Sequence, residues 1–72
     1  MEDRKMVHRA NQIAAYFEVY PEERAIQEIQ THIRKFWEPR IRAQLINYAG
    51  DDLHPLVREA VAGLRSEVQR PA

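Results

Sequence analysis

Cysteine is absent from this sequence of 72 residues, and glycine occurs only twice. Without cysteine the chain can form neither a disulfide framework nor a thiolate metal site, so its small size must be offset by tight helix packing, oligomerisation or a partner. Two glycines are too few to write the glycine-rich fingerprints that cradle nucleotide phosphates. These absences exclude a disulfide-rich scaffold and the common nucleotide-binding motifs, and they indicate a reducing, cytoplasmic setting.

An excess of charge of either sign is also missing, because 11 Lys and Arg are matched by 11 Asp and Glu. A neutral chain gives no long-range attraction to nucleic acid or anionic lipid. No apolar run approaches the ~20 residues of a membrane span, and the charged N-terminal residues lack the apolar stretch of a signal peptide. We therefore expect a cytoplasmic protein without a membrane segment.

Residues for catalysis or metal binding are few and scattered. His8, His32 and His54 show no pairing at the spacing of metal ligands, and no serine or threonine has a recognisable base beside it. The acidic pairs at 22–23 and 51–52 fit better as first-turn and loop residues than as a catalytic pair. A chain of this length buries only about 60 % of its unfolded surface, which leaves little material for a substrate cavity. The sequence predicts no catalytic, cofactor-binding or metal site.

What the chain does contain is a helical period of apolar residues in four segments. Prolines and turn residues separate them, because the residue before a proline leaves the α region and proline suits the first turn of a helix. No segment alternates with the period of two that strands show. We expect an all-α fold, a compact bundle of about four short helices in one domain over residues 1–72, with an ordered core of about 4–68 and fraying beyond it. The predicted helices cover residues 3–19, 21–37, 39–49 and 54–68.

Several residues within these helices allow specific predictions. Asp3 is the expected N-cap of the first helix, and Glu22 and Glu23 suit the first turn of the second, where the helix dipole favours acids. Asn11 either bonds a neighbouring element or faces solvent. Gly63 inside the fourth helix indicates either that the helix ends nearby or that another backbone approaches closely.

The most specialised segment is residues 32–42, which combines the only tryptophan with a phenylalanine, a proline and four cations. Adjacent helical residues point about 100° apart, so Phe36 and Trp37 cannot share one narrow face. By register with the preceding isoleucines, Phe36 belongs to the core and Trp37 is partly exposed. A partly exposed tryptophan beside arginines is a candidate anchor for a protein partner.

Arg40 strengthens this prediction. It falls in the first turn of the third helix, where the dipole disfavours a cation, so a carboxylate partner is expected from the same chain or from another subunit. We predict a protein interface formed by His32, Arg34, Trp37, Pro39 and Arg40.

Residues 34–42 also hold four cations against one acid. The alternative function is a small helical nucleic-acid-binding regulator that uses this basic junction, although the turn lacks the usual glycine and the rest of the chain is not basic. A free-standing homodimer is a third possibility.

Three stretches of the chain carry a family resemblance: MVHRANQIA at residues 6–14, HIRKFWEPRIRAQL at 32–45, and LHPLV at 53–57. In this order they resemble the delta subunit of NAD-dependent formate dehydrogenase, a family of small helical proteins with a pattern like H-I-x-x-F-W-x-P-R-M-R-x-x-L. The resemblance runs over residues 6–64.

The resemblance implies a non-catalytic accessory subunit that binds and stabilises, or helps assemble, a cytoplasmic formate dehydrogenase complex. It implies that this chain holds no cofactor, that the larger subunits carry a molybdenum or tungsten pterin, iron–sulfur clusters and FMN, and that the catalytic alpha subunit is the main partner. In isolation the chain could form a homodimer.

Two positions depart from the family pattern. Ile41 stands where the family usually has methionine, which conserves apolar volume. His54 stands before Pro55 where a small capping residue such as Asp or Ser is commoner. Because histidine is a weaker N-cap, we expect the start of the fourth helix to be either looser or tied down by a neighbouring element.

Overall fold

The computed structural model describes residues 2–69, and for Val68 and Gln69 the backbone alone. These described residues form four helices and no strand: α1 (Asp3–Phe17), α2 (Glu22–Phe36), α3 (Pro39–Ile46) and α4 (Pro55–Gln69). The predicted all-α fold is confirmed. The fraying expected beyond residue 68 lies outside the described residues, apart from the helical backbone of Gln69. Among the described helices, none has the length and apolar character needed to cross a membrane.

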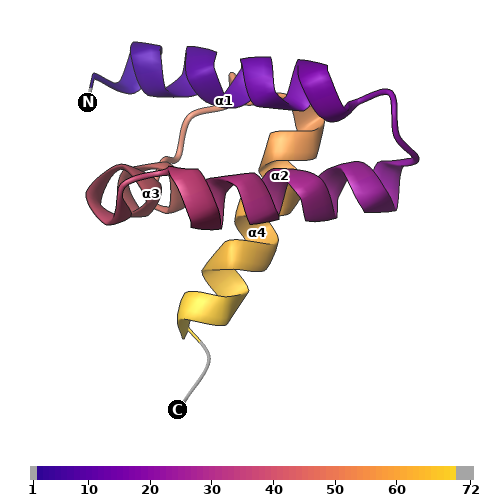
Figure 1. Ribbon diagram of the computed structural model, residues 1–72. Coiled ribbons are helices and arrows are strands. Elements are labelled where there is room, and N and C mark those ends of the chain that lie inside the picture. Colours follow the sequence, from indigo (N-terminus) through magenta and orange to yellow (C-terminus); the bar gives the residue numbers. More distant parts are fainter. Residues whose placement is uncertain (1, 70–72) are drawn as a thin grey trace.

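The helices pack as a hairpin crossed by a third long helix. α1 and α2 run antiparallel, and α4 passes behind them at a steep angle (Figure 1). The short helix α3 lies beside the end of the hairpin where α1 begins and α2 ends. α4 contacts each of the other three helices, and its largest contact is with α2.

The core is apolar, and all four helices contribute to it. Among the described residues no polar or charged residue is buried, and no buried side-chain nitrogen or oxygen lacks a hydrogen-bond partner. Such a core avoids the cost of about 1–3 kcal/mol for each unsatisfied buried group. The largest fully buried side chains are Met6, Ile29, Ile33, Leu45 and Val57.

The first helix differs from its prediction at both ends. Asp3 is the first helical residue and not the N-cap, which is Glu2 and makes no side-chain capping bond. The Asp3 carboxylate instead accepts a 2.7 Å hydrogen bond from Gln44 Nε2 of α3. The helix ends at Phe17 because the chain turns there, with the Tyr20 amide donating to the Phe17 carbonyl at 3.0 Å. Asp3 therefore joins two helices instead of capping one.

Prolines lie at or next to the first residues of α2 and α3, close to the predicted positions. Pro39 begins α3 as predicted, whereas Pro21 is the N-cap of α2 and Glu22 and Glu23 occupy its first turn. α3 ends at Ile46, earlier than the predicted residue 49. Its last carbonyl accepts a 3.1 Å hydrogen bond from Arg65 Nε of α4, a tertiary contact that sequence periodicity does not report.

The loop before α4 is held by side chains of α1. Asn11 Nδ2 donates to the Asp52 carbonyl at 3.0 Å, and Asn11 Oδ1 accepts from the His54 amide at 2.8 Å. His54 Nδ1 accepts from the Leu56 amide at 3.1 Å and thus caps α4, while its Nε2 lies 3.2 Å from Glu18 Oε2. Because Nδ1 accepts, Nε2 carries the hydrogen. Asn11 therefore bonds a neighbouring element, and the start of α4 is tied down.

Gly63 marks a close approach and not the end of a helix. α4 continues past it to Gln69, and Gln30 of α2 donates through Nε2 to the Ala60 carbonyl at 3.2 Å. A Cβ atom at position 63 would clash with this amide nitrogen. The approaching group is a side chain, so Gly63 fits neither of the two predicted alternatives, a nearby helix end or the approach of another backbone.

Candidate protein interface

The structure reverses the predicted roles of the two aromatic residues at the end of α2. Trp37 is buried with 7 % of its surface exposed, whereas Phe36 is 71 % exposed. The prediction that Phe36 belongs to the core and that Trp37 is partly exposed is therefore wrong.

The reason lies in the backbone at the end of the helix. α2 ends at Phe36, and Trp37 is extended with φ −90° and ψ 134°. The angle of about 100° between neighbours applies only inside a helix. The turn required before Pro39 directs the Trp37 side chain into the core, and Phe36 keeps its helical direction toward solvent.

The other predicted interface residues have different environments. Arg34 is bound within the chain, since its guanidinium makes two hydrogen bonds to the Glu67 carboxylate of α4. His32 is half-buried and lies against two phenylalanine rings. Pro39 is exposed at the first position of α3. Of the five residues, Arg34 and Trp37 thus serve internal contacts in this structure.

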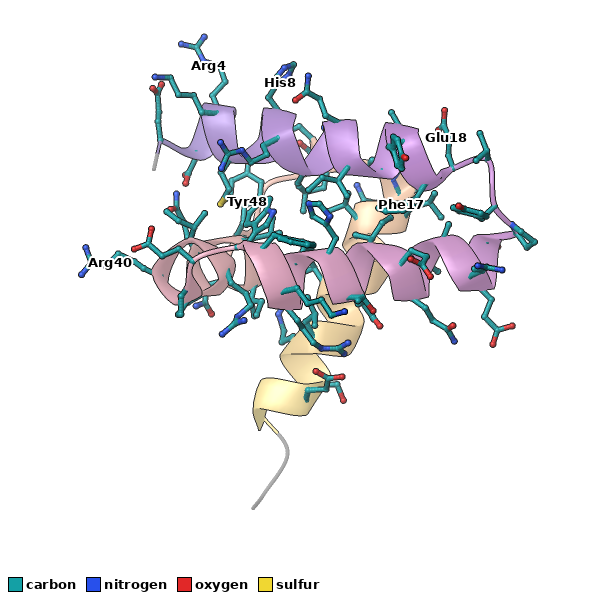
Figure 2. All side chains as sticks on the ribbon, in the orientation of Figure 1. Arg4, His8, Phe17, Glu18, Arg40 and Tyr48 are labelled. Atoms are coloured by element: carbon teal, nitrogen blue, oxygen red, sulfur yellow. The ribbon has the colours of Figure 1, made fainter. Side chains whose placement is uncertain are left out.

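Arg40 is a cation whose side chain has no partner in the described part of the chain. It lies in the first turn of α3, is exposed, and points away from the bundle (Figure 2). Within residues 2–69 it makes no hydrogen bond or ion pair, so the carboxylate expected from its position is not found in the described part of the chain. A partner that supplies a carboxylate would compensate a cation that the helix dipole disfavours by roughly 0.3–1 kcal/mol.

The basic junction is less available than its sequence suggests. Arg34 is paired with Glu67, and Arg42 donates through Nη1 to the Arg34 carbonyl at 3.2 Å at the end of α2. Two of its four cations therefore stabilise the fold. This geometry does not support the nucleic-acid alternative.

A groove of about 590 Å³ opens between α1 and α2. We call it the aromatic groove, because five of the eight residues that line it carry an aromatic or histidine ring. Tyr16 and Phe36 expose 73 % and 71 % of their surfaces on its two sides. The lining residues are Arg9, Gln12, Ile13, Tyr16, Phe17, His32, Phe36 and Trp37.

Ring contacts connect the two helices along this groove. The His32 ring lies 5.0 Å from the Phe36 ring and 6.3 Å from the Phe17 ring, measured between centroids. Phe17 also contacts Tyr16 edge-on at 5.0 Å and Tyr20 at 6.1 Å. Phe17 lies between the two helices (Figure 2). Such contacts give the surface a defined shape, because aromatic rings have few rotatable bonds.

The sequence predictions found only part of this surface. Of the residues that line the aromatic groove, only His32 and Trp37 belong to the predicted interface. A usable signal was present in the pairs Ile13 with Phe17 and His32 with Phe36, each four residues apart. Their convergence depends on how the two helices align in the hairpin, and periodicity does not give that alignment.

A second hollow, of about 440 Å³, lies between α3 and α4. There the Tyr48 hydroxyl donates a 2.7 Å hydrogen bond to Asp52 Oδ1. This bond, with partial burial and nearby carboxylates, raises the pKa of Tyr48 from its ordinary value of 10.0 to about 12. The bond closes the loop between the helices.

The described residues form no group of three or more His, Asp or Glu side chains that could hold a metal ion. Fold and surface together define a small all-helical protein with an exposed aromatic groove. A family model for the NADH-dependent formate dehydrogenase delta subunit FdsD matches residues 5–61, and the chain therefore belongs to this family, whose name describes a subunit of a formate dehydrogenase. No curated protein and no solved structure matches the chain.

Proposed function

We propose that this chain is a non-catalytic accessory subunit that binds the larger subunits of a cytoplasmic formate dehydrogenase complex and stabilises it or helps it to assemble. The catalytic alpha subunit is the proposed main contact. Family membership supports a role in the complex, and the exposure of Phe36 beside the aromatic groove is the observation that carries the binding role.

The energetic argument starts from the cost of this exposure. Burying a phenylalanine side chain stabilises a fold by about 1.5–3 kcal/mol. This chain does not obtain that stabilisation at Phe36, although a domain of this size is only marginally stable. Tyr16 is equally exposed on the facing helix. A surface of this kind gains its burial when a partner covers it, and aromatic residues dominate the energetics of protein interfaces.

The junction predicted from the sequence remains part of this proposal with altered roles. His32 and Phe36 offer rings to the partner, and Arg40 offers a free guanidinium for a bidentate pair with a carboxylate. Pro39 presents its exposed ring beside Arg40. Arg34 and Trp37 hold these residues in position from within the fold.

Cofactor chemistry belongs to the larger subunits in this proposal. They would carry the molybdenum or tungsten pterin, the iron–sulfur clusters and the FMN. The sequence supports that division, because it has no cysteine for an iron–sulfur cluster.

Purification of the tagged chain from its native host tests the proposal. We expect the larger formate dehydrogenase subunits to co-purify in a fixed ratio, and the separated chain to show no formate oxidation. We also expect a complex assembled without the chain to keep its turnover number, counted per enzyme that holds all its cofactors. The amount of assembled complex, or its lifetime, should decrease. Recovery of the chain without these subunits, or a variant that lowers turnover in a fully assembled complex, would contradict it.

A further inference from the structure

We propose that the aromatic groove binds an acidic amphipathic helix of a larger subunit, with apolar side chains in the groove and carboxylates on the cations of α1. This inference rests on the proposed function, because it specifies the segment of the larger subunits that the chain recognises. The direction in which the groove opens, its lining and the charges beside it each bear on this occupant.

On α2, the groove faces away from α4. Gln30 and Arg34 point toward α4, since they bond the Ala60 carbonyl and the Glu67 carboxylate. His32 lies two residues from each of them, about 200° around the helix and so on its opposite side. Phe36 is likewise two residues from Arg34. The face of α2 that carries the groove is therefore not covered by α4.

On α1, the same offset holds. Asn11 and Glu18 contact the loop before α4 through Asp52 and His54. Arg9 and Ile13, which line the groove, each lie two residues from Asn11 and so on the opposite side of α1. The hairpin thus has one face filled by a helix of its own chain and a second face, between the same two helices, that is open.

The lining of the open face suits a helix. Ile13 and Phe17 form a row along α1, and His32 and Phe36 form a row along α2, each pair separated by one helical turn. Side chains of a third helix fit between two such rows, as in other helix-in-groove complexes. On the other face, α4 already packs an apolar face against this hairpin.

The charges beside the groove favour carboxylates on the bound helix. From residue 4 to residue 17 the sequence holds three cations, Arg4, Lys5 and Arg9, and no acid. Arg4 forms one ion pair, with Glu2 at 3.7 Å. Within residues 2–69 neither Lys5 nor Arg9 makes an ion pair. Arg4 points outward from α1 (Figure 2).

These cations are continuous with the aromatic groove. A shallow hollow of about 490 Å³ is lined by Arg4, Lys5, His8, Arg9 and Gln12, and the last two residues also line the groove. At the other end of the hairpin acids outnumber cations, with Glu18, Glu22 and Glu23 against Arg24. The carboxylates of the bound helix therefore belong at the Arg9 end.

A second copy of this chain fits the surface less well. A symmetric dimer places the same patch of both subunits in contact, so a groove would face a groove and neither would receive a helix. With the two hairpins parallel, the Arg9 ends would also meet, and like charges at an interface oppose association. An acidic helix enters the groove and satisfies the same cations, and this comparison favours it as the partner.

Photo-cross-linking tests the occupant directly. The full chain carries Phe36→p-benzoylphenylalanine in its native host, and the same replacement at exposed Ala62 of α4 serves as the matched control. We expect position 36 to cross-link a peptide of a larger formate dehydrogenase subunit with apolar residues at helical spacing and Asp or Glu beside them. We expect position 62 not to cross-link that peptide.

The outcomes separate the two proposals. If the chain co-purifies with formate dehydrogenase but position 36 cross-links a second copy, a segment without acids, or nothing, the occupant is wrong and the proposed function stands. If the chain does not co-purify with that enzyme while position 36 cross-links an acidic helical segment of another protein, the proposed function fails and the chemistry of the occupant stands.

Charge reversal tests the cations. The double variant Lys5→Glu with Arg9→Glu is titrated against complex that holds fluorescently labelled wild-type chain, with Arg24→Glu at the far end of the hairpin as control. At low salt we expect the double variant to displace the label about tenfold more weakly, and we expect this difference to shrink at high salt. Equal displacement by both variants at low salt would overturn the role of the cations.

Discussion

The two faces of the α1–α2 hairpin differ in how their side chains are used. On the face toward α4, Asn11, Gln30 and Arg34 all bond to α4 or to the loop before it. On the other face, Tyr16 and Phe36 leave about three quarters of their surfaces in solvent, at 73 % and 71 %. The same two helices thus hold the fold together on one side and present a binding surface on the other.

Two neighbouring residues at the end of α2 also differ in burial. Trp37 is buried in the core and Phe36 is exposed, although they are adjacent in the sequence. Substitutions that affect the first face should change stability, and substitutions on the second should change affinity.

The largest expected effect is the loss of stability in Trp37→Ala. Removing a buried tryptophan costs about 3–5 kcal/mol, a large share of the stability of a domain of this size. Phe36→Ala should cost less than about 1 kcal/mol, because its ring is mostly exposed already. Chemical denaturation followed by circular dichroism measures both. Equal destabilisation of the two variants would remove the distinction between the faces.

Asn11→Ala should have the next largest effect. It removes both hydrogen bonds that hold the loop before α4, and we expect a loss of about 2 kcal/mol in the free energy of unfolding. The neighbouring Gln12 is exposed, so Gln12→Ala should change stability by less than about 0.5 kcal/mol. Thermal unfolding of the two variants compares them. A Gln12 effect as large as that of Asn11 would contradict this assignment.

His54→Ala should cost about 1 kcal/mol, because α4 loses its N-cap and Glu18 loses its partner. His54→Asn retains a capping oxygen and should recover most of this loss, although it does not reach Glu18. Denaturation midpoints of the two variants measure the difference. If His54→Asn is as unstable as His54→Ala, capping is not what His54 contributes.

The smallest effect concerns Tyr48 at alkaline pH. Its pKa is about 12 in the fold against 10.0 ordinarily, so its hydrogen bond to Asp52 stabilises the fold below pH 10. That contribution is lost as the pH rises from about 10 through about 12. Asp52→Asn should lower the pKa of Tyr48 toward its ordinary value. Ultraviolet titration of each protein, after subtraction of its Tyr48→Phe counterpart, measures the pKa of Tyr48. An equal pKa in the wild type and in Asp52→Asn would exclude the hydrogen bond between Tyr48 and Asp52.

Much of the fold follows from local patterns. The apolar period and the prolines predict four helices in the right order, and Pro39 marks the start of α3 to the residue. The family resemblance read from three motifs is confirmed over residues 5–61. These features depend on neighbours within a few residues, which sequence patterns report well.

The parts that could not be predicted depend on tertiary contacts. Trp37 was misplaced because helical register was extended one residue past the helix end. Asn11 was left with two alternatives, since its partners Asp52 and His54 lie 41 and 43 residues away. The aromatic groove joins residues of α1 to His32 and Phe36 of α2, and only the alignment of the hairpin brings them together.

The most direct test of a hairpin with one structural and one binding face is a competition experiment with Phe36→Ala. Wild-type and variant chains with different tags are co-expressed in the native host, and their ratio in purified formate dehydrogenase is measured together with the unfolding midpoint of each isolated chain. We expect nearly equal midpoints and at least about tenfold less variant in the complex. Equal incorporation of both chains, or a loss explained by a lower midpoint, would contradict this account.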